Sequence, residues 1–313
     1  MKPTQSELQL IFSMIFLAVV GFFYVRGVRQ EIARGEVLEQ QMAEYEESIK
    51  PFLDIALNAD AFAIYDMDKS EFVYKRNAEQ VMPLASLAKI MSAIVVMENV
   101  PADHVFTISK DALSIIGDNK LLVDERWTRD ELLQFTLVES SNDAIYEMAL
   151  ETGAIIDPTA ADPRSVFIAK MNDKAKELKL QSLKFNNESG LDETAELSGA
   201  YGNSRDVSRI LSYAVKTYPD IMLPTTKSAP IFNSLDTQHV AKNTNPIVES
   251  IDGIVASKTG FTNISGGNLA VAIESATGRK LVMTVLGSTF DDRFTDIMTL
   301  SGAVNGEVKE TPE

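Results

Sequence analysis

In this 313-residue chain, residues 61–77 and 253–287 have a strand-like pattern, whereas residues 86–215 between them have mostly the pattern of helices. Strands from both ends can join one antiparallel sheet with helices on both faces, which is an α+β architecture. The predicted strands form a hairpin over residues 61–77, with its turn at 67–70, and three segments at 253–260, 267–274 and 280–287.

Ser86-Leu87-Ala88-Lys89 places a hydroxyl and an amine on one face of a predicted helix. Side chains three residues apart are neighbours on a helix surface, so the serine hydroxyl is expected beside the lysine amine. The serine is expected in the first turn, where free backbone N–H groups and the helix dipole favour developing negative charge. The apolar positions that define the buried face are Leu87, Ile90, Met91, Ile94 and Val95.

A serine hydroxyl becomes an effective nucleophile only when a base accepts its proton. The two histidines, His104 and His239, stand in no recognisable Ser-His-Asp arrangement. A lysine can serve as the base if burial and neighbouring cations lower its pKa enough to leave some neutral amine near neutral pH. Lys89 and Lys258 provide such a pair, and we expect a lysine to activate Ser86.

Two further motifs follow, Ser140-Ser141-Asn142 and Lys258-Thr259-Gly260, and each of the three motifs occurs once. Taken alone, the first fits an ordinary helix start, the second a polar helix cap and the third a turn. The third motif closes the strand-like residues 253–257, so its lysine and threonine are expected at a strand end that faces a cleft. Together and in this order, the motifs predict a serine active site for acyl transfer.

Over about residues 58–304 the chain resembles the D-alanyl-D-alanine carboxypeptidases, which are low-molecular-mass penicillin-binding proteins of the penicillin-binding protein/β-lactamase superfamily. Besides the motifs, residues 61–77 resemble the opening hairpin of that family, and residues 171–178 with 185–191 resemble its middle signature. The chain departs from the signature at Glu188-Ser189, where the family usually has Pro-His. This departure touches none of the three motifs.

The resemblance implies a β-lactamase/penicillin-binding transpeptidase-like fold, in which a five-stranded antiparallel sheet flanked by helices adjoins a helical lobe. The site would lie in the cleft between them. The resemblance also implies a serine-type D-Ala-D-Ala carboxypeptidase that removes the terminal D-alanine from peptidoglycan stem pentapeptides through an acyl-enzyme on Ser86. Such an enzyme needs no cofactor and no metal, and β-lactam antibiotics are its covalent inhibitors.

The same resemblance assigns roles to the catalytic residues. Lys89 accepts the proton of Ser86, and Asn142 orients Lys89 and the substrate amide. Ser140 and Lys258 relay a proton to the departing D-alanine.

Four further residues are implied to bind the substrate. The oxyanion hole combines the backbone N–H groups of the nucleophile and of Phe261. Gly260 lines the same wall, and Thr259 and Arg293 hold the terminal carboxylate. From the residues alone, the arginine has an alternative, a surface position paired with Asp291 or Asp296.

Three other functions fit parts of the sequence. A class A β-lactamase needs a carboxylate that activates the deacylating water, normally in Glu-x-x-Leu-Asn, and residues 177–181 come near that pattern. A DD-endopeptidase, which cuts cross-links instead of terminal residues, shares all three motifs. A wall-binding or penicillin-sensing module without catalysis is the non-enzymatic alternative, but it has no need of an intact Ser-Lys pair.

Composition excludes several function classes. The formal net charge is −16 and no Lys/Arg block interrupts it, which argues against nucleic-acid binding. The chain has no cysteine, so zinc-thiolate sites and cysteine nucleophiles are excluded. Two histidines and no His-Glu-x-x-His motif argue against a metallopeptidase.

The amino-terminal segment predicts a membrane anchor. Residues 10–25 contain no charged residue, and a helix over residues 8–25 reaches about 27 Å at ~1.5 Å per residue, near the hydrocarbon thickness of a bilayer. A cleaved signal peptide is the alternative, with a small-residue site at Ala33-Arg34-Gly35. We favour a retained anchor because three arginines lie between residues 26 and 34.

The balance of basic residues on the two sides of this segment favours an amino terminus outside the cytoplasm and a catalytic domain inside it. A substrate outside the cytoplasmic membrane instead requires the catalytic domain to lie outside. We therefore expect a single-pass protein of the bacterial cytoplasmic membrane. Many relatives continue into a carboxy-terminal β domain, so the stalk is expected to provide the spacing here. The predicted parts are a short cytoplasmic amino terminus (1–7), the anchor (8–25), a polar helical stalk (26–57), the catalytic domain (58–304) and an acidic tail (305–313).

Overall fold

The computed structural model describes residues 5–52, 55–117 and 120–306, and the chain divides between residues 53 and 54 into two units. The first unit consists of the long helix α1 (Gln5–Ile49) and the 3-10 turn η1 (Lys50–Phe52). Its side chains from Phe22 to Ala43 are all exposed.

The predicted anchor, residues 8–25, falls within α1, but most of its side chains lie outside the described part of the chain. Among the described residues, no helix is long and apolar enough to cross a membrane. The anchor therefore stays a prediction. Residues 1–4 of the short amino terminus and residues 307–313 of the acidic tail also lie outside the described residues.

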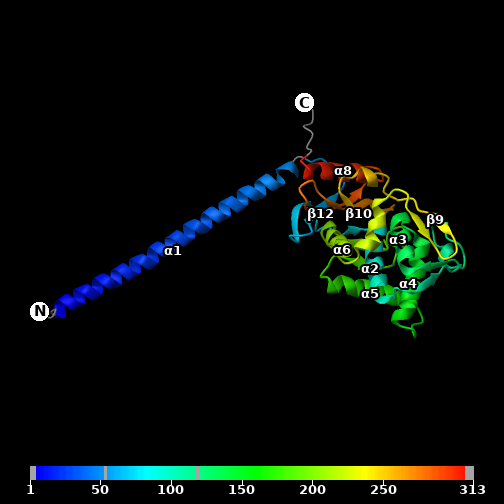
Figure 1. Cartoon of the computed structure of the whole chain (residues 1–313), viewed down its shortest axis with the longest axis horizontal. Helices are drawn as coiled ribbons and strands as arrows, with labels where there is room; N and C mark the ends of the chain where they lie inside the picture. The colour runs from blue at the N-terminus through cyan, green and yellow to red at the C-terminus, as the bar shows by residue number, and fades with distance from the viewer. Residues whose placement is uncertain (1–4, 53–54, 118–119, 307–313) are drawn as a thin grey trace, which may run out of the picture. The chain divides into compact units, whose positions relative to one another are not determined.

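The second unit is built on a five-stranded antiparallel sheet with the strand order β10-β11-β12-β1-β2 (Figure 1). β1 pairs with β12, with Ala63 opposite Thr284, so strands from the two ends of this unit share one sheet. This confirms the α+β architecture. The strands are β1 (Ala61–Asp66), β2 (Glu71–Arg76), β10 (Ile254–Thr262), β11 (Gly266–Glu274) and β12 (Lys280–Ser288).

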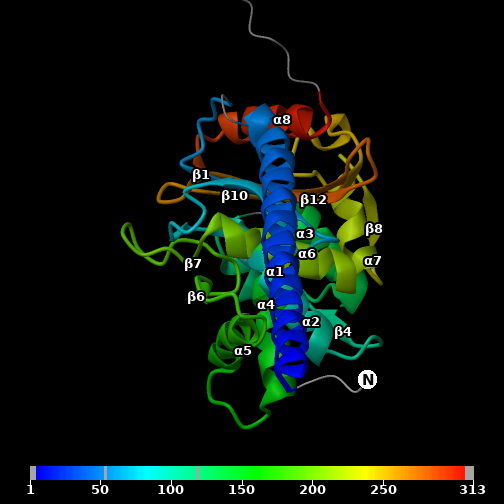
Figure 2. The same cartoon turned by 90° about the vertical axis from the view of Figure 1, so that its left-hand side faces the viewer.

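Helices cover both faces of this sheet (Figures 1 and 2). α8 (Asp292–Val304) packs on one face, and α6 (Ser204–Thr217) packs on the other. The Ser208 hydroxyl of α6 donates to Thr284 Oγ1 of β12 at 2.8 Å, which fixes the helix to the sheet. The residues that form the buried apolar stripe of α6 at helical spacing are Val207, Ile210, Leu211 and Ala214.

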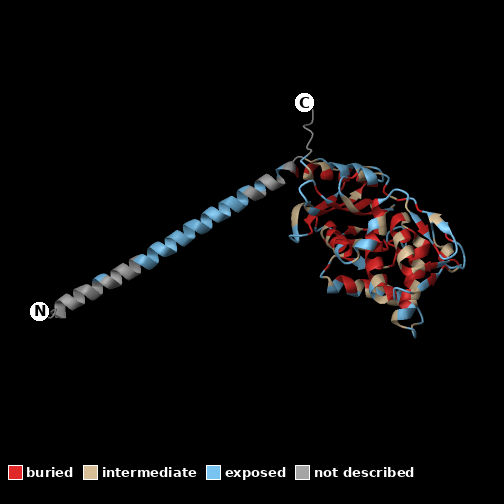
Figure 3. Cartoon of the chain, in the orientation of Figure 1, coloured by how far each residue is buried: buried red, intermediate tan, exposed pale blue. Residues whose placement is uncertain are grey.

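A helical lobe adjoins the sheet and shares its core, as the buried residues in Figure 3 show. Its central helix is α2 (Lys89–Asn99), which is buried from Lys89 to Val96 and packs against α4, α5 and α6. The lobe also contains α3 (Arg129–Glu139), α4 (Asn142–Ile156), α5 (Pro163–Glu177) and α7 (Pro219–Met222).

The single tryptophan, Trp127, is fully buried in this lobe. Its ring centroid lies 5.3 Å from that of Phe135 on α3 and 5.1 Å from that of His239. His239 Nε2 lies 2.6 Å from Glu125 Oε1. Trp127 and His239 belong to two short pairs of strands, β4 with β5 and β8 with β9, so these contacts join both pairs to α3.

The short strands and turns were not predicted, because two or three residues are too few to show a period. The strands are β3 (Met82–Pro83), β4 (Val105–Thr107), β5 (Arg126–Thr128), β6 (Lys184–Phe185), β7 (Ala200–Gly202), β8 (Ile231–Asn233) and β9 (Gln238–Val240). The 3-10 turns are η2 (Ala85–Ala88), η3 (Ala112–Ser114), η4 (Leu223–Thr226) and η5 (Val248–Ser250).

Candidate active site

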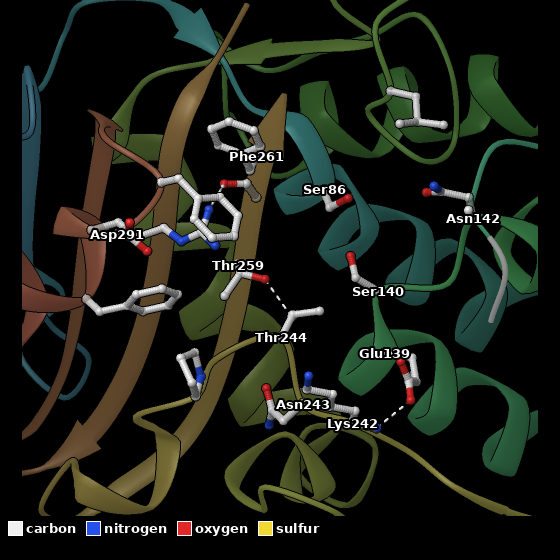
Figure 4. Close-up of a pocket in the computed structure, with 17 residues that line it drawn as sticks. Ser86, Glu139, Ser140, Asn142, Lys242, Asn243, Thr244, Thr259, Phe261 and Asp291 are labelled. Carbon is white, nitrogen blue, oxygen red and sulfur yellow. Dashed lines mark hydrogen bonds between the residues drawn. The ribbon is translucent and has the colours of Figure 1, made fainter. Parts of the chain in front are cut away.

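A cleft of about 660 Å³ lies between strand β10 and the helical lobe (Figure 4). All three sequence motifs contribute to its wall, with Ser86, Ser140 and Asn142 on the helical side and Thr259 and Gly260 on β10. The structure therefore brings together motifs that are far apart in the sequence. Other residues that line the cleft are Gly117, Thr244, Phe261, Phe290, Arg293 and Phe294.

Ser86 lies half-buried in the 3-10 turn η2, directly before α2. The prediction placed it in the first turn of the helix itself. The difference arises because the chain reaches the helix through Ala85, which has a φ of +48°, and through this tighter turn. A left-handed conformation costs a non-glycine residue about 1 kcal/mol, so the turn needs support from its neighbours. Gly190 packs directly against this residue, since a Cβ at Gly190 would lie 1.9 Å from the Ala85 carbonyl oxygen.

The Lys89 amine is fully buried and contacts the Ser86 hydroxyl. Its Nζ lies 2.9 Å from Ser86 Oγ, 2.8 Å from Asn142 Oδ1 and 3.1 Å from the Ser189 carbonyl oxygen. Burial lowers the pKa of Lys89 to about 7, against an opposing effect of the Glu188 charge. The sequence predicted a lowered pKa, and in the structure burial is its main cause.

Asn142 is the first residue of α4, and its amide is held from both sides. Its Nδ2 donates to the Ile116 carbonyl oxygen at 2.8 Å, which leaves Oδ1 directed at Lys89. A Cβ at Gly117 would lie 3.1 Å from the same Nδ2, so the loop approaches the amide closely.

Ser140 and Lys258 form a second hydroxyl–amine pair. Ser140 ends α3 in the left-handed conformation, with a φ of +61°. The Lys258 Nζ donates to Ser140 Oγ at 2.9 Å and to the Thr259 carbonyl oxygen at 3.0 Å. Burial, together with the charges of Lys89 and Arg293, lowers the pKa of Lys258 well below its usual value.

Gly260 allows β10 to approach the turn that carries Ser86. A Cβ at this position would lie 2.7 Å from the Leu84 carbonyl oxygen and 3.3 Å from the Leu87 amide nitrogen. Only a glycine fits without a shift of one backbone. The next residue, Phe261, lines the same cleft as Ser86.

Arg293 lies near the start of α8 and is only 3% exposed. Its Nη1 donates to the Gly260 carbonyl oxygen at 3.2 Å, and its guanidinium carbon lies 4.4 Å from the ring centroid of Phe290 and 4.6 Å from that of Phe294. The alternative pairing with Asp296 is not formed, because that carboxylate accepts hydrogen bonds from Asn58, Ala59 and Ser288.

Several contacts in the cleft have no signal in the sequence. The Thr244 hydroxyl lies 2.6 Å from that of Thr259, and the Ser189 contact with Lys89 uses a backbone oxygen. Glu177, the candidate carboxylate of the β-lactamase alternative, lies outside the cleft lining and has a mostly exposed side chain that pairs with Lys174 at 2.8 Å. The near-match of residues 177–181 to the β-lactamase pattern therefore does not place a carboxylate in the cleft.

Comparison with known proteins shows which family this chain resembles. A family model described as D-alanyl-D-alanine carboxypeptidase matches residues 46–289. The D-alanyl-D-alanine carboxypeptidase DacF of Bacillus subtilis is 27% identical over 77% of this chain and 60% of its own length. A D-alanyl-D-alanine endopeptidase of Haemophilus influenzae is 28% identical over 67% of this chain and 69% of its own.

A solved structure has the same fold. Penicillin-binding protein D2 of Listeria monocytogenes, in its ampicillin-bound form, matches with a TM-score of 0.67 and 28% identity over 80% of this chain and 98% of that one. The chain spans less than two thirds of the Bacillus relative, so the match concerns the shared domain. From the family match over most of its length and the penicillin-binding protein fold, we conclude that this chain belongs to the D-alanyl-D-alanine carboxypeptidase family of serine peptidases.

Proposed function

We propose that this chain is a serine-type D-Ala-D-Ala carboxypeptidase that removes the terminal D-alanine from peptidoglycan stem pentapeptides and is acylated by β-lactams. The observation that carries the proposal is the buried Lys89 amine, 2.9 Å from Ser86 Oγ, with a pKa of about 7. Such an amine is partly neutral near neutral pH and can accept the serine proton. The family, and relatives named for this activity, support the same function.

In the acylation step, Ser86 Oγ forms a bond to the carbonyl carbon of the penultimate D-alanine while its proton moves to Lys89 Nζ. The backbone N–H groups of Ser86 and Phe261 stabilise the negative charge that develops on the carbonyl oxygen. The close approach of β10 at Gly260 supports this arrangement. Asn142 holds the base and offers its amide to the substrate backbone.

The peptide C–N bond then breaks, and the departing nitrogen needs a proton. Lys258 is the source, and the Ser140 hydroxyl, 2.9 Å from its Nζ, passes the proton on. Water hydrolyses the resulting ester and restores Ser86. The lowered pKa of Lys258 makes it a better proton donor than an ordinary lysine.

The free carboxylate of the leaving D-alanine would bind Arg293 and Thr259. Arg293 is nearly fully buried, and among the described residues its Nε has no hydrogen-bond partner. A carboxylate in the cleft would supply an acceptor for this donor. A site that binds a free terminal carboxylate favours carboxypeptidase over endopeptidase activity.

DD-endopeptidase activity is the second candidate, because the similar Haemophilus protein is named as an endopeptidase. The chemistry at Ser86 would be the same, but the leaving group would be the cross-linking amino acid of a second stem peptide. The two activities therefore differ in what the Arg293 side of the cleft must hold.

The test of the proposed function is Ser86→Ala in the full chain. We expect it to fold normally, to lose covalent labelling by a fluorescent penicillin and to lose release of D-alanine from a pentapeptide, because the acyl-enzyme cannot form. Ser212→Ala, at a buried serine of α6, is the control that should retain both activities. Substantial D-alanine release by a folded Ser86→Ala protein contradicts the mechanism.

The behaviour of the wild type with penicillin separates the alternatives. Stable labelling supports a penicillin-binding peptidase, and rapid turnover of the label indicates a β-lactamase. No labelling at all indicates a wall-binding module without catalysis.

For the location, we propose that residues 8–25 anchor the chain in the cytoplasmic membrane and that residues 26–57 form a stalk. The uncharged run at residues 10–25 and the continuous helix α1 support this proposal. The catalytic domain, residues 58–304, would then lie outside the cytoplasm, where peptidoglycan is found.

A further inference from the structure

The loop at residues 187–191 carries a buried ion pair that the proposed reaction does not use. Glu188 is only 3% exposed, and its two carboxylate oxygens accept hydrogen bonds from Arg164 Nη2 at 2.9 and 2.8 Å. Arg164 comes from α5, and its guanidinium carbon lies 4.5 Å from the ring centroid of Tyr146 on α4. The ion pair therefore ties the loop to two helices of the lobe.

The same loop contacts the helix that carries the base. The Ser189 carbonyl oxygen accepts a hydrogen bond from Lys89 Nζ at 3.1 Å, and the Glu188 carbonyl oxygen accepts one from Ser92 Oγ at 2.6 Å. Lys89 and Ser92 are three residues apart on α2, so both bonds fasten the loop to one face of this helix.

Asn187 holds the loop in shape. Its Oδ1 accepts hydrogen bonds from the backbone N–H groups of Ser189 at 3.2 Å and Gly190 at 2.7 Å. Hydrogen bonds within the loop, to α5 and to α2 therefore fix the position of Glu188 relative to α2.

The charges around Lys89 are mostly positive. Lys258 of β10 and Arg293 of α8 belong to the same site, and the charges of Lys89 and Arg293 contribute to the lowered pKa of Lys258. Of the described charged groups, Glu188 is the one whose charge raises the pKa of Lys89. The other buried charged groups on the helices packed against α2 are Arg129 of α3, Asp143 and Glu147 of α4, Lys174 of α5 and Asp206 of α6.

We propose that Glu188, held in place by Arg164, is a positioning residue that sets how strongly Lys89 holds its proton, and thereby the pH range in which Ser86 is acylated. This inference rests on the proposed function, because it concerns the base of that reaction. A buried carboxylate favours the protonated amine, and the paired guanidinium weakens this effect. Removing either partner should therefore move the pH range, and the two removals should move it in opposite directions.

The test measures the rate of Ser86 labelling by a fluorescent penicillin in the full chain between about pH 5 and 9. Labelling should rise with pH as Lys89 loses its proton, with a midpoint near 7 for the wild type. Glu188→Gln removes the negative charge and leaves Arg164 in place, so the midpoint should fall by about one pH unit. Glu188→Asp, which restores the charge, should return the midpoint towards that of the wild type.

Arg164→Gln is the second variant, and it keeps the test decisive if Glu188→Gln does not fold. It leaves the carboxylate uncompensated, so the midpoint should rise. Asp66→Asn is the matched control, because Asp66 is also a buried carboxylate held by a partly exposed arginine, with Arg279 Nη2 at 2.9 Å and Nε at 3.1 Å. It should lower the melting temperature and leave the midpoint unchanged.

The results separate this inference from the proposed function. Folded Glu188→Gln and Arg164→Gln proteins that both keep the wild-type midpoint would show that the pair only supports the fold, and the inference would be overturned. A wild type that is not labelled at any pH would overturn the proposed function and this inference with it.

Discussion

At the scale of single residues, Arg293 is the strongest candidate for substrate recognition. Burial lowers its pKa to about 10, with the Asp291 charge opposing, so the guanidinium stays charged at neutral pH. Phe290 and Phe294 lie within 4.6 Å of it and limit its contact with water. A buried charge of this kind gains most from an anionic partner in the cleft.

Arg293→Ala should weaken the turnover of peptides with a free terminal carboxylate by about 2 kcal/mol in kcat/KM, the usual contribution of a charge-assisted hydrogen bond. An amidated substrate should lose a similar amount with the wild type and little more with the variant. The measurement is release of the terminal residue from both peptides with both proteins. Equal loss by the variant on both substrates would assign the arginine to the fold, and undiminished wild-type cleavage of the amidated peptide would favour the endopeptidase.

Residues differ in how far the sequence could predict them. Ser86 and Lys89 were predicted as neighbours because helical spacing alone fixes their relation, and the hydrogen bond between them is present. The Ser189 oxygen that also holds Lys89 is a backbone atom, which any residue type could supply. Glu188 was visible only as a departure from a family pattern, and its burial and its pairing with Arg164 required the fold.

At the scale of elements, the long strands and the hairpin were predictable because their strand-like runs extend over six to nine residues between turn signals. That strands from both ends join one sheet followed from the layout of the chain, whereas the pairing of β1 with β12 is seen only in the structure. The 3-10 turn at Ser86 did not, because it depends on the left-handed Ala85 and on the loop packed against it. Such turns are fixed by tertiary contacts and not by local propensity.

Gly260→Ala tests whether the approach of β10 to η2 matters for the reaction. The new Cβ would lie 2.7 Å from the Leu84 carbonyl oxygen, so the strand and the turn must separate. We expect the rate of penicillin acylation to fall by at least about tenfold, since positioning errors of this kind cost one or more orders of magnitude. The free energy of unfolding should fall by about 1 to 3 kcal/mol.

Gly278→Ala is the control, because it introduces backbone strain without displacing a neighbouring strand or turn. Gly278 has a φ of +77° in the turn between β11 and β12, and nothing lies within 4 Å of a Cβ placed there. This variant should lose stability and keep its acylation rate. A Gly260→Ala protein with the wild-type rate would show that the close approach is not required.

At the scale of the whole molecule, the chain consists of a long helix and a catalytic unit with its own core. If residues 8–25 are retained as an anchor, the full chain should stay with membranes after a high-salt or carbonate wash. A fragment of residues 54–313 should be released and keep its penicillin labelling, because the described cleft lies entirely within it. The measurement is the distribution of labelled protein between pellet and supernatant. A mature amino terminus at Glu36 would instead establish cleavage of a signal peptide.

The lone tryptophan gives this protein a built-in optical reporter. Trp127 is the single residue of its type, is fully buried against the rings of Phe135 and His239, and is not part of the cleft lining. Its fluorescence therefore reports the integrity of the helical lobe, whereas covalent labelling reports the geometry of the cleft. During denaturation the two signals can be followed in the same sample. A loss of labelling that precedes the change in emission would reveal a state in which the reactive cleft has opened while the lobe is still packed.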